Sequence, residues 1–281
     1  MVRIIIDSAC DMPKKEADAL KIDFLPLKTI FGEEEFLDGI TITHDEFYTR
    51  LENSTTNPST SQISPAEYED IYEDVKKSGD TAVVITLSSK LSGTYQSANI
   101  ARDGYEDCIH IVDSENVTLG EQLLVRYACE LRELGFSAEE IVEALEKKKK
   151  NIHVVAVLDT LEYLQRGGRI SKTVAVAGNL LSIKPVIAIC DGEVALIAKS
   201  RGLKNASSAM TEAALSYGTI DFSMPCAYVY SGHSDELLQK YIIGRPNDWD
   251  GQTDAIPVYS IGSTIGTHVG PGAYGFAFFV K

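Results

Sequence analysis

The chain has 281 residues, of which 26 are Lys or Arg and 41 are Asp or Glu, so its formal charge is −15. Because nucleic-acid binding needs surplus cations to neutralise phosphates, this balance argues against a nucleic-acid-binding protein. Apolar residues (44%) and charged residues (24%) occur at frequencies typical of globular proteins, and no apolar run reaches the roughly 20 residues of a transmembrane segment. Five scattered cysteines, none in a Cys-x-x-Cys pair, predict reduced thiols and a cytoplasmic protein.

The charge is distributed unevenly along the chain. Residues 33–80 contain 13 acidic and 3 basic side chains, a net charge of −10. Residues 162–204 contain 7 basic and 3 acidic side chains, a net charge of +4. Such a basic segment is either an ordinary solvated face or a docking surface for an acidic or phosphate-bearing partner.

The first 150 residues alternate between predicted strands and helices. Apolar, β-branched runs predict strands at Val2–Ile6, Ile22–Phe31, Thr81–Leu87 and Cys108–Val112. Helices are expected at 13–20, 44–51, 64–77, 95–102 and 120–134 and from Ser137 onward, and Ser64–Glu67 and Ser137–Glu140 match capping boxes. This alternation predicts a parallel, doubly wound α/β domain over residues 1–150.

The remaining residues, 151–281, are expected to form an α+β domain with a mixed sheet. The predicted strands are 153–158, 185–190, 194–199, 226–230, 255–259 and 274–280. Asp191-Gly192 is typical of a hairpin turn between two of these strands. Helices are expected at 160–165, 171–181, 205–216 and 235–243, and residues 262–275 are expected to form a glycine-rich loop.

Three polar loops, at residues 58–62, 88–94 and 262–268, are candidates for binding. The second lies between a strand and a helix, where free backbone N–H groups and the helix dipole favour an anion. Ser92 and Thr94 add hydroxyl donors, and Gly93 lets a ligand approach the backbone. A plain helix cap by Ser92, with nothing bound, explains the same residues.

Other kinds of site lack their usual sequence signals. No Walker lysine-serine pair and no Gly-x-Gly-x-x-Gly follows a strand, and the five histidines show no metal-binding spacing, so we expect no metal and no cofactor. His268 lies among glycines, where it can orient a hydroxyl or act as a general base toward Ser92. The second role would make the protein an acyl hydrolase, although Ser92 is not in a Gly-x-Ser-x-Gly elbow.

Seven short motifs occur in an order that resembles one known family. They are DSACD (7–11), TSQ (60–62), SSKLSGTYQSA (88–98), IVDS (111–114), RGGRISK (166–172), IKP (183–185) and THVGPGA (267–273). Together they resemble the DegV family of bacterial fatty-acid-binding proteins, over nearly the whole chain. One departure is Ala9, which stands where the family often has threonine.

The resemblance implies a two-domain carrier, rather than an enzyme, that holds one long-chain fatty acid in a tunnel between its domains. It further implies that a separate ATP-dependent fatty acid kinase converts the presented acid to acyl-phosphate for phospholipid synthesis. The family's carboxylate ligands correspond to Thr60 and Ser92, with His268 in their hydrogen-bond network. As neighbours of these residues we add Ser61, Gly93 and Thr94.

The basic segment then becomes a candidate for the surface that docks the kinase. We expect Arg166, Arg169, Lys172 and Arg201 to contribute to it, because they cluster beside a glycine break in an acidic chain. Two alternatives to the fatty-acid carrier remain at this point. One is the Ser92–His268 acyl hydrolase, and the other is a binding module for a different amphipathic anion.

Overall fold

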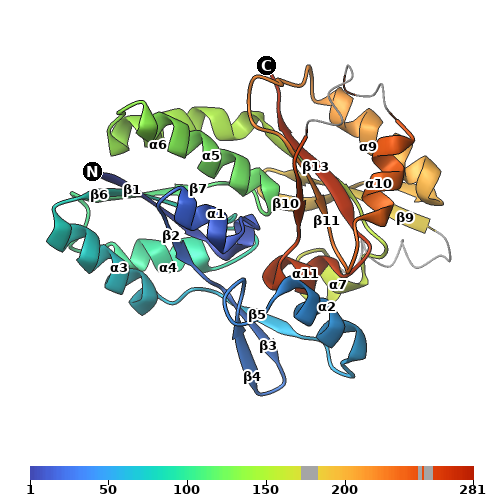
Figure 1. Ribbon diagram of the computed structural model, residues 1–281, viewed down its shortest axis with the longest axis horizontal. Coiled ribbons are helices and arrows are strands. Elements are labelled where there is room, and N and C mark those ends of the chain that lie inside the picture. Colours follow the sequence, from blue (N-terminus) through green and yellow to red (C-terminus); the bar gives the residue numbers. More distant parts are fainter. Residues whose placement is uncertain (172–182, 246–248, 250–255) are drawn as a thin grey trace.

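The structure is a computed structural model that describes residues 1–171, 183–245, 249 and 256–281 (Figure 1). Over these residues the strands form a four-stranded, a six-stranded and a three-stranded sheet. The helix expected over 171–181 lies outside the described residues except for its first residue.

The first half of the chain forms the predicted parallel sheet. Its strands are β1 (Val2–Asp7), β2 (Ile22–Leu25), β6 (Thr81–Thr86) and β7 (Ile109–Asp113). Its helices are α1 (Lys14–Ala19), α3 (Pro65–Ser78), α4 (Thr94–Ala101), α5 (Leu119–Glu133) and α6 (Ala138–Lys148). The strand order is β2-β1-β6-β7 and every pair is parallel. Helices α5 and α6 cover one face and α3 and α4 the other (Figure 1), which confirms the doubly wound class.

The second half forms the predicted mixed sheet. Its strands are β8 (Ile152–Val157), β9 (Ile183–Cys190), β10 (Glu193–Arg201), β11 (Ala227–Tyr230), β12 (Val258–Ser260) and β13 (Tyr274–Phe279). Their order is β10-β9-β8-β13-β11-β12, with β11 and β12 parallel and the other pairs antiparallel. Helices α9 (Leu203–Ser216) and α10 (Glu236–Ile243) pack on this sheet, and α5 of the first half contacts β8 and β13. The boundary predicted between residues 150 and 151 remains a prediction.

The sequence patterns predicted several local features correctly. Asp191 and Gly192 both have positive φ, as a hairpin turn between β9 and β10 requires. In α3, Ser64 accepts from the N–H of Glu67, and the Glu67 side chain accepts from the N–H of Ser64. Ser137 and Glu140 form the same capping box in α6.

The segment predicted as one strand over Ile22–Phe31, with Pro26 expected to mark an edge or an irregularity, is divided at that proline. The chain instead forms β2 and, after a break at Pro26, strand β3 (Lys28–Phe31), which belongs to the three-stranded antiparallel sheet β4-β3-β5. Proline has no N–H to donate to a ladder, and the N–H of the next residue, Leu27, donates to the side chain of Ser8 instead of to a strand. The outer strands of the small sheet are β4 (Glu34–Leu37) and β5 (Ser59–Ser61).

Two segments predicted as loops contain regular structure. The polar loop at 58–62 contributes β5, which pairs with β3. The glycine-rich segment 262–275 contains helix α11 (Ser263–Val269), which packs against α2 (His44–Asn53) and α7 (Glu162–Arg166). Gly266 permits this packing, because a Cβ there would lie 2.5 Å from the ring of Phe47. Tertiary contacts therefore override the low helix propensity of glycine.

Three carboxyl groups are completely buried where η1 (Ser8–Cys10) and the start of α5 meet. They belong to Asp7, Asp11 and Glu121, and burial is the main cause of the raised pKa of each. The pKa rises to about 7 for Asp7 and to about 8 for Asp11. Asp11 accepts hydrogen bonds from the hydroxyl of Thr118 and from the N–H of Gly262, so it connects the two halves of the chain.

These pKa values predict that the protein loses stability as the pH rises through neutrality. In the unfolded chain the Asp carboxyls lose their protons near the ordinary pKa of 3.8, whereas in the folded protein Asp7 and Asp11 retain them to higher pH. The folded state therefore binds more protons between these limits, and each such group lowers the free energy of unfolding by about 1.4 kcal/mol per pH unit. The stabilisation is complete at low pH and is lost as the pH rises through the folded pKa values.

Denaturant unfolding at a series of pH values between about 5 and about 7 measures this slope. We expect Asp7→Asn to have a shallower slope than the wild type, because Asn does not titrate. Asp70→Asn, on the exposed face of α3, should keep the wild-type slope. An unchanged slope in Asp7→Asn would mean that Asp7 is ionised in the folded protein.

Candidate functional site

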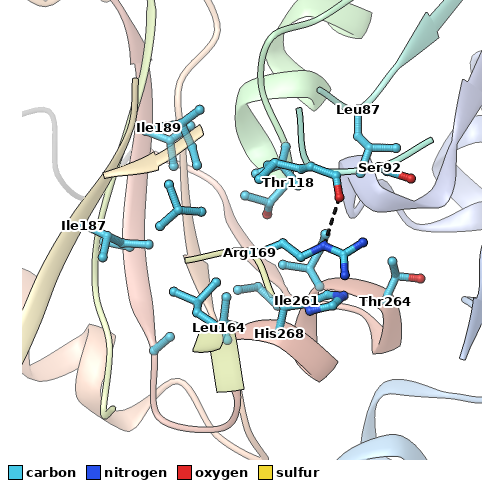
Figure 2. Close-up of a pocket in the computed structure, with 18 of the residues that line it drawn as sticks. Leu87, Ser92, Thr118, Leu164, Arg169, Ile187, Ile189, Ile261, Thr264 and His268 are labelled. Atoms are coloured by element: carbon cyan, nitrogen blue, oxygen red, sulfur yellow. Dashed lines mark hydrogen bonds between the residues drawn. The ribbon is translucent and has the colours of Figure 1, made fainter. Parts of the chain in front are cut away.

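A cavity of about 160 Å³ lies between the two halves of the chain (Figure 2). Most of its wall is aliphatic. Because side chains alternate along a strand, Val154 and Ala156 of β8 share the face that lines it. Ile187 and Ile189 of β9 do the same, and in Figure 2 they lie on the side opposite Ser92. The first half contributes Leu27, Leu87, Leu91 and Val117.

The predicted binding residues gather at one end of this cavity. Thr60 and Ser61 come from β5, Ser92 and Gly93 from the loop before α4, and His268 from α11, and all five line the cavity. Thr94 is buried behind Ser92. The structure thus brings together side chains from three segments that are far apart in the sequence.

Thr60 and His268 form a hydrogen bond across this end, with 3.0 Å between Thr60 Oγ1 and His268 Nε2. Burial, and secondarily the charge of Arg169, lowers the pKa of His268 to about 4, so the ring is neutral at physiological pH. Its Nδ1 is buried and has no hydrogen-bond partner among the residues that the structure describes, and a Cβ on Gly167 would lie 2.1 Å from it. A hydrogen on Nδ1 would be an unpaired buried donor, so we place it on Nε2, where it donates to Thr60 Oγ1.

Ser92 is supported in a similar way. Its Oγ accepts from the backbone N–H of Thr94 at 3.2 Å and lies 3.0 Å from Thr94 Oγ1. When Thr94 donates its hydroxyl hydrogen to Ser92, the hydrogen of Ser92 is free for another acceptor. Because His268 donates to Thr60, the hydroxyl hydrogen of Thr60 is free as well. Two hydroxyl donors therefore face the same end of an apolar cavity.

The residues predicted to dock a partner lie in different places. Arg169 lines the cavity, and Figure 2 shows its guanidinium between Ser92 and His268. It donates to the carbonyls of Leu91 (2.9 Å) and Gly167 (2.5 Å). Arg166 is exposed in α7, Arg201 is exposed at the end of β10, and Lys172 lies outside the described residues.

A second, more open groove of about 480 Å³ adjoins the polar end of the cavity. It shares Thr60, Arg169 and His268 with the cavity wall and adds Arg166 and Tyr163. The polar end of the cavity is therefore next to a surface groove that is lined by two arginines, Arg166 and Arg169.

Several wall residues were not predicted from the sequence. Gln62 lines the cavity beside Gly93, where a Cβ would lie 2.0 Å from Gln62 Oε1, and its membership of the TSQ motif was the available signal. Thr118 lines the cavity with a positive φ of 50° and is held by Asp11. Thr264 lies one helical turn before His268. Thr264 belongs to the polar segment 262–268 that was a candidate for binding, but the sequence did not single it out, and no sequence pattern indicated Thr118.

The geometry does not provide a serine hydrolase dyad. His268 Nε2 contacts Thr60 rather than Ser92, and His268 Nδ1 has no carboxylate to orient the ring. Within the described residues, no cluster of three or more His, Cys, Asp or Glu side chains is arranged to hold a metal ion. In the same part of the chain, no helix combines the length and apolar character needed to cross a membrane.

The fold and site define an α/β protein with an apolar cavity between its two halves and neutral hydroxyl donors at one end. Residues 1–281 match the model of a protein family whose description is "Uncharacterised protein, DegV family". The chain therefore belongs to the DegV family. A DegV domain-containing protein of Caldanaerobacter subterraneus is 35% identical over 278 residues, 99% of this chain and 98% of the relative. Protein DegV of Bacillus subtilis is 31% identical and covers 100% of this chain and 99% of its own length.

Solved structures of the family have the same fold. One is a DegV family protein from Thermus thermophilus whose structure is described as showing fatty acid binding. It has a TM-score of 0.89 at 29% identity, and the match covers 100% of this chain and 99% of that protein. A stearic acid-binding protein from Eubacterium ventriosum has a TM-score of 0.86 at 27% identity, with the same coverage. DegV of Bacillus subtilis, described as a fatty acid binding protein, has a TM-score of 0.84 at 31% identity, again with the same coverage.

Proposed function

We propose that this protein binds one long-chain fatty acid, with the carboxylate at Thr60 and Ser92 and the acyl chain in the cavity. The observation that carries the proposal is the pair of hydroxyls, Thr60 and Ser92, on the wall of a mainly aliphatic cavity, each with a hydrogen-bond partner behind it. The fatty acid binding described for the Thermus and Bacillus relatives supports it.

The two ends of such a ligand would be held by different forces. Hydrogen bonds to an ionised acceptor are roughly twice as strong as those between neutral groups, so two hydroxyls can hold a carboxylate. Arg169 adds a positive charge to the same end of the cavity. The acyl chain contributes about 0.8 kcal/mol for each methylene that leaves water, and it supplies most of the affinity.

Removing either hydroxyl tests the carboxylate site. We expect Thr60→Val and Ser92→Ala each to weaken palmitate binding by about 10- to 150-fold, because a hydrogen bond to a charged group contributes about 1.5–3 kcal/mol. Isothermal titration calorimetry measures this loss.

The matched ligand in this experiment is 1-hexadecanol, which keeps the chain but lacks the charge, so its affinity should change much less in both variants. Thr49→Val, on the exposed side of α2, is the control protein. Equal palmitate affinity in the wild type and both variants would contradict the proposed carboxylate site.

We further propose that the protein presents the bound acid to a separate ATP-dependent fatty acid kinase, which forms acyl-phosphate. The chain has no nucleotide-binding motif of its own, so the phosphoryl donor would have to come from a partner. The proposed carboxylate position adjoins the surface groove that carries Arg166 and Arg169. Arg166, Lys172 and Arg201 belong to the basic segment and are our candidates for the docking surface. Arg169 lines the cavity and would instead act at the carboxylate end.

Charge reversal separates docking from fatty acid binding. Arg166→Glu and Arg201→Glu should leave palmitate affinity unchanged, because both side chains are exposed and neither lines the cavity. Acyl-phosphate formation by the kinase should fall by at least threefold at low salt and less at high salt, since exposed interface charges mainly affect association. Lys240→Glu, on the exposed side of α10, is the control. Unchanged phosphorylation in both arginine variants would refute docking through these residues.

A further inference from the structure

Asp38 is a buried carboxylate at the N-terminus of α11, the helix that carries His268. Only 3% of its surface is exposed. One oxygen, Oδ1, accepts from the N–H and from the hydroxyl of Ser263, both at 2.8 Å. The other, Oδ2, accepts from the hydroxyl of Ser8 at 3.0 Å. Asp38 therefore connects the end of β1 to the first turn of α11.

The contact between Asp38 and α11 is close and specific. Gly262 precedes the helix, and a Cβ there would lie 2.9 Å from Asp38 Oδ1. The first N–H groups of a helix lack partners within the helix and carry a partial positive charge, so a carboxylate at this point stabilises and orients the helix. Asp11 accepts from the N–H of Gly262 at the same helix end.

Ser263 also connects this helix to β3, the strand that pairs with β5, which carries Thr60. The hydroxyl of Thr29 donates to Ser263 Oγ at 2.8 Å, and Thr29 is completely buried. Thr29 lies directly opposite Thr60 in the pairing of β3 with β5. The contacts form a closed loop that runs from Thr60 to His268, along α11 to Ser263, and through Thr29 back to Thr60.

We propose that Asp38 is a positioning residue for the carboxylate site. By fixing Ser263, it sets the place of α11 relative to β5 and with it the hydrogen bond between Thr60 and His268. This inference rests on the proposed fatty acid binding, because the quantity that Asp38 controls is the affinity for a carboxylate. Asp38 itself is not among the residues that line the cavity.

Paired measurements of acid and alcohol affinity test the proposal. Asp38→Asn keeps one acceptor oxygen and replaces the other by an NH2 group, so either the bonds from Ser263 or the bond from Ser8 loses its acceptor. We expect palmitate affinity to fall about tenfold while 1-hexadecanol affinity stays within about twofold. Ser263→Ala, which removes the hydroxyl between Asp38 and Thr29, should shift the ratio in the same direction, and it provides the test if Asp38→Asn does not fold. Ser137→Ala removes the cap of α6, away from the cavity, and should leave the ratio unchanged.

A double-mutant cycle with Thr60→Val gives the second test. If Asp38 acts through Thr60, adding Asp38→Asn to Thr60→Val should cause no further loss of palmitate affinity. Equal losses for acid and alcohol in Asp38→Asn and Ser263→Ala, or fully additive losses in the cycle, would overturn the positioning role. A wild-type protein that binds no palmitate would instead overturn the proposed function itself, so the two failures are distinguishable.

Discussion

The hydrogen bond between Thr60 and His268 joins the two halves of the chain at the head of the cavity, over 3.0 Å and a separation of 208 residues. Thr60 lies on a short strand of the first half, and His268 lies on a short helix of the second. Because burial keeps the imidazole neutral, it acts as a hydrogen-bond partner and not as a buried cation. The proposed role of the Thr60 hydroxyl as a donor to a carboxylate depends on that contact.

The surrounding structure serves to place these two small elements. Strand β5 is held by β3, and helix α11 is held at its N-terminus by the buried side chains of Asp11 and Asp38. At its other end, Gly167 approaches His268 so closely that a side chain would collide with the ring. The six-stranded sheet provides one aliphatic side of the cavity, through residues such as Val154 and Ile187. In the first half the aliphatic wall comes from segments that follow the strands, such as Leu27 and Leu87, and not from the strands of the four-stranded sheet.

The sequence was sufficient for the parts that depend on local pattern. Continuous apolar strands such as Thr81–Thr86 and the capping boxes at Ser64 and Ser137 follow from periodicity and capping, and the structure confirms them. Helix α11 could not be predicted, because Gly266 within it and the glycines at both of its ends disfavour a helix, whereas the packing against Phe47 and the bonds from Ser263 to Asp38 depend on tertiary structure. The different locations of Arg166 and Arg169 also could not be predicted. The two arginines are only three positions apart, and the sequence does not show which guanidinium points into the cavity and which points to solvent. The family resemblance indicated Thr60, Ser92 and His268, which all line the cavity, whereas the Asp38–Ser263–Thr29 contacts join residues with no shared motif.

The central claim is that the cavity holds a long-chain fatty acid. Denaturing extraction of the purified protein, followed by mass spectrometry of the organic phase, tests this claim most directly, because a cavity with an apolar wall and an anion-binding end should retain its ligand through purification. The account predicts a co-purified acid of about 14 to 20 carbons in an amount close to one per chain. Repeated preparations that contain no such acid, and that show no thermal shift when palmitate is added, would contradict it.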